Sequence, residues 1–315
     1  MAIAPIPMRP AYRFGASTPW GGKGLNTCFG KEIPDERTGE ALECSAIPGL
    51  NSTDERGTPL SVLIGQLGEK LVGTEVKGEF PLLLKLLNAR DRLSVQVHPD
   101  DAYAREHENK LGKTEAWVIL HAEPGASIIY GVNEGVTREL LEQASLQGAA
   151  IEKLLRRVPV RAGETYYIPA GTVHAIGEGI TLYEIQQTSD VTYRFYDWER
   201  TDATGKKRQL HLKDAIAVTD LERAGGAAKP LEIAPGIWQL LKNEHFTLER
   251  WAQKKEVLMP DPRRFSILTA LGDTVLSWPG GSLSLRGGDT VLLPACGEEL
   301  EVSTVELLLA YPTVD

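Results

Sequence analysis

Four side chains in three separate segments of this chain have the types that bind first-row divalent metal ions. Gln96 and His98 alternate with apolar residues along one segment. Glu115 follows a Gly-Lys-Thr sequence, and His174 follows a Pro-Ala-Gly turn. Two imidazoles, a carboxylate and an amide oxygen form a mixed nitrogen and oxygen site that leaves room for water or substrate. We expect one Zn²⁺ per chain, with modest selectivity against other divalent first-row metals because the set has no thiolate.

Strand alternation would position these side chains. In Leu-Ser-Val-Gln-Val-His, residues 93–98, the apolar side chains share one face and Ser94, Gln96 and His98 share the other. In residues 112–119, Lys113 and Glu115 share a face by the same rule. A polar face inside a β-protein needs water, a ligand or a metal to satisfy it. Each segment alone also fits a strand with one solvated face, so the prediction depends on their combination.

A second polar group follows in residues 180–198, which have the pattern of two strands joined by a Thr-Ser-Asp turn. Glu184 lies on the first expected strand and Arg194 on the second. A guanidinium stays protonated at working pH, so Arg194 would be a fixed positive charge near the metal segment. The alternative is a cation stacked at the edge of the β-structure.

Composition limits the class of protein. The 315 residues are 42% hydrophobic and 24% charged, a globular balance sufficient for two domains. The formal charge of −9 argues against nonspecific nucleic-acid binding. No segment approaches the length needed to cross a bilayer, and three cysteines without a C-x-x-C pair suit a reducing compartment. We therefore expect a cytoplasmic protein, and no pattern indicates an obligate protein partner.

Glycine and proline punctuate mostly short apolar runs, which indicates many short strands. Helical periodicity is confined to residues 58–71, to 137–158 with a break at Gly148, and to about 212–223. Residues 161–171 and 286–296 share a Gly–acid–Thr turn before an apolar strand that ends in Pro-Ala. This repeat predicts two related β-units. His174 follows the first copy, but the equivalent position after the second is Glu299, so we expect no metal in the second unit.

Four motifs agree in order and spacing with those of one family. They are Gln-Val-His-Pro-Asp-Asp at 96–101, Gly-Lys-Thr-Glu-Ala-Trp at 112–117, Tyr-Ile-Pro-Ala-Gly-Thr-Val-His-Ala at 167–175 and Tyr-Arg-Phe-Tyr-Asp-Trp at 193–198. Together with Trp-Gly-Gly at 20–22 and Gly-Glu-Ala-Leu-Glu-Cys-Ser at 39–45, they resemble type I mannose-6-phosphate isomerases. The resemblance covers at least Trp20 to Asp220 and fits the shorter, bacterial form. It departs from the family at Leu42, where a tryptophan is common.

The resemblance implies a mainly β fold of two cupin-like (jelly-roll) β-barrels with a few short helices. Residues 1–235 would form the catalytic barrel, with helical insertions near 58–71 and 137–158, and residues 236–315 the metal-free second barrel. It also implies a zinc enzyme that interconverts mannose 6-phosphate and fructose 6-phosphate through a cis-enediol.

Site residues carry over position by position from the resemblance. The metal ligands would be His98, Glu115 and His174, with Gln96 as the fourth. The active-site residues would be Arg194, Lys113 and Glu184, and the residues at the phosphate end would be Lys85 and Ser94. Glu184, His98 and Lys113 all remain candidates for the general base.

Two other functions would use the same residues. A cupin oxygenase would hold Fe²⁺ with two histidines and a carboxylate and react with O₂. A noncatalytic cupin would only bind a sugar. The nearby cations Lys85, Lys113 and Arg194 favour a phosphorylated substrate over the oxygenase, and the complete ligand set with these cations favours an enzyme over a binding protein.

Overall fold

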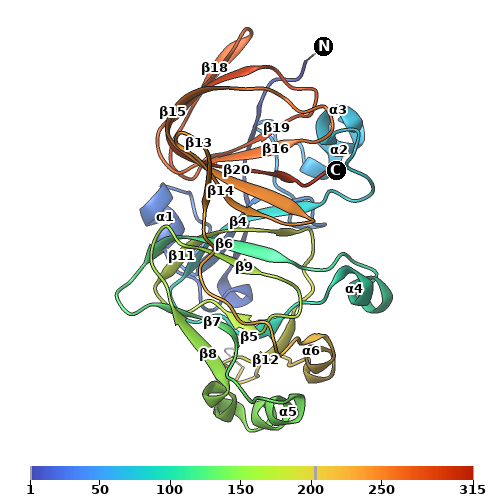
Figure 1. Ribbon diagram of the computed structural model, residues 1–315, viewed down its shortest axis with the longest axis vertical. Coiled ribbons are helices and arrows are strands. Elements are labelled where there is room, and N and C mark those ends of the chain that lie inside the picture. The colour runs from blue at the N-terminus through green and yellow to red at the C-terminus, as the bar shows by residue number, and fades with distance from the viewer. Residues whose placement is uncertain (1, 202–203, 315) are drawn as a thin grey trace.

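The computed structural model describes residues 2–201 and 204–314, and it is built mainly from β-strands (Figure 1). The strands form three sheets in which all the pairings between strands are antiparallel. The prediction of a mainly β fold with a few short helices is therefore confirmed. Within the described ranges, no helix is both long and apolar enough to cross a membrane.

Two of the sheets come from the first two thirds of the chain. The six-stranded sheet has the order β2 (Ala11–Phe14), β3 (Thr38–Cys44), β4 (Leu82–Ala89), β11 (Ile180–Gln187), β6 (Glu115–Ala122) and β9 (Thr165–Ile168). The five-stranded sheet has the order β12 (Tyr193–Tyr196), β5 (Val95–Val97), β10 (His174–Ala175), β7 (Ser127–Val132) and β8 (Leu155–Pro159).

The third sheet has nine strands and occupies one end of the molecule (Figure 1). Its main path is β1 (Ile6–Met8), β19 (Thr290–Leu293), β16 (Ser266–Ala270), β20 (Leu300–Pro312), β15 (Phe246–Leu258), β14 (Ile237–Lys242) and β13 (Leu231–Ala234), and the hairpin of β17 (Thr274–Trp278) and β18 (Gly281–Leu285) pairs with β20. The first strand of the chain thus belongs to the C-terminal sheet, and β13 lies before the expected boundary at residue 235. The division into two domains stays a prediction.

Side-chain alternation makes the six-stranded sheet the middle layer of the molecule. On β4, β6 and β11, alternate apolar residues such as Leu84, Val118 and Ile185 join the core shared with β14, β15, β16 and β20. The intervening residues, such as Leu87 and Trp117, join a second core with β7. Lys85 lies two residues from Leu87, Glu115 two residues from Trp117, and Glu184 two residues from Leu182, which also joins the second core. These polar residues therefore lie on the face opposite the C-terminal core.

The helices are shorter than their periodicity predicts. The first predicted helix is two, α2 (Leu60–Leu67) and α3 (Glu69–Val72), separated at Gly68, whose φ is 51°. The second is α5 (Arg138–Leu146) and the 3₁₀ helix η2 (Gly148–Lys153), so a break at Gly148 is confirmed, but residues 155–158 form strand β8. The third is α6 (Leu212–Val218). The sequence analysis missed η1 (Gly15–Ser17), α1 (Gly24–Phe29) and α4 (Asp101–Glu108).

The repeat seen in the sequence forms the same local structure twice. The backbone N–H of Arg161 donates to Glu164 Oε2, and that of Arg286 donates to Asp289 Oδ2, each over 2.8 Å. The turn glycines Gly163 and Gly288 have φ values of 88° and 94°, which favour glycine. Strands β9 and β19 follow these turns, so the two copies share a local turn geometry, and two related β-units stay a prediction.

A buried ion pair joins the N-terminal part of the chain to the nine-stranded sheet. Lys31 Nζ lies 2.7 Å from Glu43 Oε1, and it also donates to the carbonyl of Gly288 over 2.9 Å. The Glu43 side chain is fully buried. Burial raises the pKa of Glu43, while Lys31 opposes this rise. Lys31 is thus the cation that makes a charged carboxylate tolerable at this junction.

We expect Lys31→Met to lower the free energy of unfolding by roughly 3–5 kcal/mol, because it leaves Glu43 buried without its cation. The double variant Lys31→Met/Glu43→Gln should recover a large part of the loss. Urea unfolding, followed by tryptophan fluorescence, measures both. Equal midpoints for Lys31→Met and the wild type would show that the pair does not stabilise the junction.

Candidate metal centre and active-site pocket

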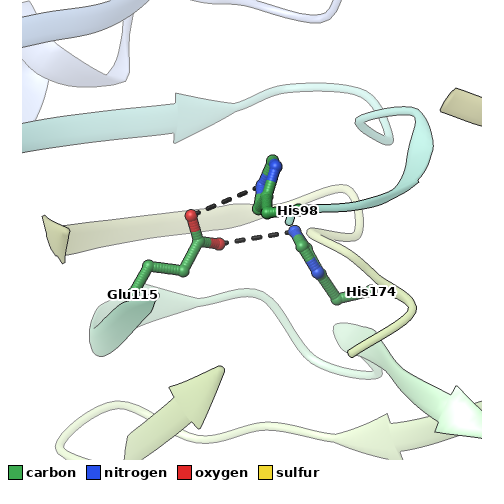
Figure 2. Close-up of side chains that lie close together, drawn as sticks. All are labelled: His98, Glu115 and His174. Carbon is green, nitrogen blue, oxygen red and sulfur yellow. Dashed lines mark ion pairs between the residues drawn. The ribbon is translucent and has the colours of Figure 1, made fainter. Parts of the chain in front are cut away.

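Three buried side chains from separate strands converge between the five- and six-stranded sheets. His98 follows β5, Glu115 begins β6 and His174 begins β10. One ligand atom from each lies within 4.8 Å of the other two, and each residue is 1% exposed. Figure 2 shows the Glu115 carboxylate facing both imidazoles, with Oε2 at 3.6 Å from His98 Nε2 and Oε1 at 3.4 Å from His174 Nε2.

Backbone carbonyls fix the orientation and the tautomer of the two imidazoles. His98 Nδ1 lies 2.8 Å from the carbonyl of Val191, and His174 Nδ1 lies 2.9 Å from that of Thr172. A carbonyl only accepts hydrogen bonds, so each Nδ1 carries the proton and, in the neutral ring, each Nε2 has a free lone pair. Burial lowers the pKa of His174 to about 4 and that of His98 well below its usual range. The centre therefore gathers two imidazole lone pairs beside Glu115, whose pKa is raised to about 7 by burial against the opposing effect of Lys113.

Lys113 supplies the positive charge at this centre in the structure. Its Nζ lies 3.0 Å from His98 Nε2 and also contacts Glu115 Oε2. Gln96 completes the group, with Nε2 at 3.4 Å from His98 Nε2 and 3.3 Å from His174 Nε2. The nitrogen and oxygen of an amide are interchangeable by a half turn, so Gln96 is positioned to supply its oxygen to the same point.

These donors fit a divalent metal ion. Two lone pairs of neutral imidazole and a carboxylate are the ligand set of many zinc and iron sites. The hydrogen bonds from each Nδ1 are the outer contacts that orient ligating histidines. Among residues 2–201 and 204–314, these three residues form the one cluster of this kind, and none lies near Glu299.

A second buried group lies beside the centre on the six-stranded sheet. Lys85 Nζ donates to Glu184 Oε1 over 2.8 Å, and Trp117 Nε1 donates to Glu184 Oε2 over 3.0 Å. Lys85 also lies 3.7 Å from Glu40 Oε2. Burial opposes the ionisation of Glu184, but Lys85 and Lys113 hold its pKa well below the usual range. Glu184 is thus an ionised carboxylate with both oxygens engaged.

Strand register places Arg194 next to the metal centre. Arg194 pairs with Gln96 across β12 and β5, and Gln96 pairs with His174 across β5 and β10. Side chains opposite each other on antiparallel strands have Cβ atoms about 4.5–5.5 Å apart. The pKa of Arg194 is lowered to about 10, by burial first and then by Arg208 and Arg13, against the opposing effect of Asp197.

One pocket brings together all but one of the predicted site residues. Its lining includes Lys85, Ser94, Gln96, Lys113, Glu115, His174, Glu184 and Arg194, and His98 is buried behind Gln96 and Lys113. The sequence analysis missed Arg13, Glu40, Trp117 and Arg208, which also line it. Glu40 and Trp117 belong to the quoted motifs and could have been found there, whereas no local pattern marks Arg13 or Arg208. The predicted roles of these residues stay predictions.

The fold and the centre define a β-sheet protein with a buried His-Glu-His cluster suited to a divalent metal ion. Residues 15–114 match the family model "Phosphomannose isomerase type I, catalytic domain". The chain is 40% identical over 282 residues to a mannose-6-phosphate isomerase from Streptococcus mutans, covering 87% of this chain and 88% of that protein. It therefore belongs to the type I mannose-6-phosphate isomerase family.

Solved structures agree with this assignment. The crystal structure of the mannose 6-phosphate isomerase from Bacillus subtilis matches with a TM-score of 0.88 and 33% identity, over 98% of this chain and 99% of that one. A zinc-bound mannose 6-phosphate isomerase has a TM-score of 0.79 over 99% of this chain and 100% of its own. At 17% identity, this second likeness concerns the fold alone.

We predict that the purified chain holds about one divalent ion and that His174→Ala loses it, because one of three strong donors is removed. The variant should keep its far-UV circular dichroism, since the sheet cores do not need the ion to form. Elemental analysis after desalting measures the metal content. His121→Ala, which changes an exposed histidine on the same strand as Glu115, is the control. A His174→Ala protein with wild-type metal content would contradict the assignment.

Proposed function

We propose that this chain interconverts mannose 6-phosphate and fructose 6-phosphate as a divalent-metal enzyme. The observation that carries the proposal is the buried convergence of His98, Glu115 and His174 on one point, in a pocket that also contains Lys85, Lys113 and Arg194. Family membership supports the same reaction. An oxygenase would have no use for this set of cations.

Zn²⁺ is the metal we propose, held by His98, Glu115 and His174, with Gln96 as the fourth ligand. When bound, the ion would polarise the sugar oxygens at C1 and C2. Binding would separate Lys113 from Glu115 and His98, because the ion would take over both contacts. Lys113 would then be available to a substrate oxygen from the same side of the pocket.

The isomerisation moves one proton between C2 and C1 through a cis-enediol. A base removes the C2 proton of the aldose, O1 gains a proton, O2 loses its proton, and C1 receives one. Arg194 and Lys113 would stabilise the negative charge that develops on these oxygens. Arg194 suits this role because its Nε is buried without a hydrogen-bond partner in the described part of the chain and its guanidinium stays charged.

Contacts narrow the candidates for the general base. Glu184 has one oxygen on Lys85 and the other on Trp117, and its lowered pKa makes it a weak base at neutral pH. The Nε2 atom of His98 faces Glu115, at the place proposed for the metal ion. We therefore propose that Glu184 orients Lys85 and that Lys113 is the strongest remaining candidate for the base. Lys113 would take the C2 proton as a neutral amine, and the ammonium so formed would stabilise the developing negative charge.

Other expectations from the sequence remain proposals. Lys85 and Ser94 line the pocket, as residues at the phosphate end should. We propose that the five- and six-stranded sheets form the walls of a cupin-like barrel, although the strand pairing of the described residues leaves each sheet open. The nine-stranded sheet would be the metal-free second barrel, which braces the first. A cytoplasmic location stays a prediction from the cysteine pattern.

The function is tested by a coupled assay that starts from mannose 6-phosphate and detects fructose 6-phosphate. We expect turnover by the purified enzyme, loss of turnover after chelation, and recovery with Zn²⁺ or a similar ion. Full turnover by a protein that elemental analysis shows to be metal-free would refute the proposed mechanism. Oxygen uptake without isomerisation would instead support the oxygenase, and binding without turnover would support the sugar-binding alternative.

We expect Arg194→Ala to reduce kcat roughly 10²- to 10³-fold, because it removes a preorganised charge that acts in the transition state. KM should change much less, and metal content should stay at the wild-type level. Arg194→Lys should retain part of the activity, since it keeps a positive charge without the planar fork. If Arg194→Ala stays within about threefold of wild type in both parameters, under ~1 kcal/mol, Arg194 does not act in the reaction.

A further inference from the structure

The buried lysine of the pocket has little positive charge to offer a phosphate group. Lys85 is 6% exposed and lies between two carboxylates, 2.8 Å from Glu184 Oε1 and 3.7 Å from Glu40 Oε2. Both carboxylates are buried. A phosphate brought to Lys85 would therefore meet the repulsion of Glu184 and Glu40 as well as the attraction of the ammonium.

Three arginines line the same pocket, and nearby carboxylates neutralise their charges less completely than they neutralise the charge of Lys85. Arg13 lies on the edge strand β2, Arg194 lies on the edge strand β12, and Arg208 follows β12. Arg208 Nη1 is buried without a hydrogen bond among the described residues, 3.6 Å from Asp197 Oδ2. Asp197 also contacts Arg200, so it cannot balance Arg208 alone.

Arg13 also shares its neighbouring carboxylate, Glu40, with another cation. Its Nη1 lies 3.9 Å from Glu40 Oε2, the oxygen that Lys85 also approaches. The Arg13 side chain is 30% exposed and that of Arg208 is 31% exposed, so both can be reached from solvent. Glu40 and Glu184 together match Arg13 and Lys85. The net positive charge of this side of the pocket, the wall lined by Arg13, Lys85, Arg194 and Arg208, therefore comes from Arg194 and Arg208.

The charges of this wall sum to an excess of two. Four cations, Arg13, Lys85, Arg194 and Arg208, line it together with the carboxylates Glu40 and Glu184. Two further carboxylates near this wall each contact a cation outside the lining: Asp190 lies 2.6 Å from Lys110, and Asp197 contacts Arg200. A sugar phosphate carries about −1.5 to −2 charges at pH 7. The excess therefore matches the ligand that the proposed function requires.

We propose that Arg13 and Arg208 bind the phosphate group of the substrate, beside Arg194 and apart from the metal centre. This inference rests on the proposed function and assigns the phosphate to residues other than Lys85 and Ser94. Guanidinium groups match phosphate oxygens in paired hydrogen bonds. Arg194 shares a cross-strand row with Gln96 and His174, so a sugar could extend from the metal past Arg194 to the two arginines.

The crowding of the arginines agrees with this assignment. The pKa of Arg194 is lowered by burial first, then by Arg208 and Arg13, which shows that the three charges act on one another. Burial also lowers the pKa of Arg208. A bound dianion would relieve this mutual repulsion, so the pocket is suited to an anion.

The test measures phosphate binding and catalysis separately, with the zinc-loaded enzyme. Isothermal titration with inorganic phosphate should show about ten- to hundredfold weaker binding for Arg208→Gln and for Arg13→Gln, the loss expected for a charged hydrogen bond. KM for mannose 6-phosphate should rise by a similar factor, while kcat stays within about threefold. Arg208→Lys should recover part of the phosphate affinity.

Matched variants separate this site from its alternatives. Arg157→Gln removes the same charge from an arginine on β8 that does not line this pocket, and it should bind phosphate like the wild type. Ser94→Ala tests the phosphate position implied by the family resemblance. If Ser94→Ala weakens phosphate binding tenfold while Arg13→Gln and Arg208→Gln bind like the wild type, our assignment is overturned.

Measuring phosphate binding separately from turnover distinguishes this inference from the proposed function. A wild-type enzyme that binds phosphate through the arginines but does not isomerise mannose 6-phosphate would refute the function and leave the arginine site in place. An active isomerase whose phosphate affinity is unchanged in both arginine variants would refute the site and leave the function in place. If a glutamine variant fails to fold, as judged by circular dichroism, the lysine variant at the same position decides.

Discussion

Two buried imidazole lone pairs and a buried carboxylate that face one another are the constraint on which this structure depends. The Val191 and Thr172 carbonyls commit both Nδ1 protons, so both Nε2 lone pairs point toward Glu115. Such a group is unstable in a low-dielectric interior unless a cation joins it. Lys113 fills this need in the structure, and a divalent ion would fill it more completely because it can contact all three ligands at once.

The middle sheet shows how a sheet that forms the core can also support a charged pocket. One face of β4, β6 and β11 is apolar and packs on the C-terminal sheet, which leaves the other face free to carry Lys85, Glu115 and Glu184. Each of these charges has an opposite charge in contact. Because strands fix side-chain direction with a period of two, a shift of one residue in β6 would turn Glu115 toward the apolar core. The hydrophobic pattern therefore sets the registry of the metal centre as well as the fold.

Local patterns in the sequence predicted the elements of the site but not everything around it. Alternation in residues 93–98 and 112–119 separated Val95, Val97, Ala116 and Val118, which join apolar cores, from the polar residues that meet in the pocket, but Leu93 lines that pocket too. Residues 155–158 were predicted as helix because their apolar spacing fits a helix and a strand alike, and pairing with β7 decided for the strand. Arg13 and Arg208 could not be predicted, since their place depends on two sheet edges meeting at one pocket. Pairing between distant strands also places β1 in the C-terminal sheet, and no local pattern carries that information.

The pocket keeps the groups suited to a cation apart from the groups suited to an anion. If they shared one place, the charges that favour one ion would weaken the binding of the other. At the metal centre, neutral imidazoles and one carboxylate favour a divalent cation, and an adjacent excess of fixed positive charge would weaken its binding. At the wall between β2 and β12, the arginines favour an anion, and a nearby unpaired carboxylate would repel it. Lys85 and Glu184 form a paired ammonium and carboxylate, so together they add little net charge to either place. A protein with a formal charge of −9 can thus bind an anionic sugar, because the local balance of one buried wall outweighs the charge of the distant surface.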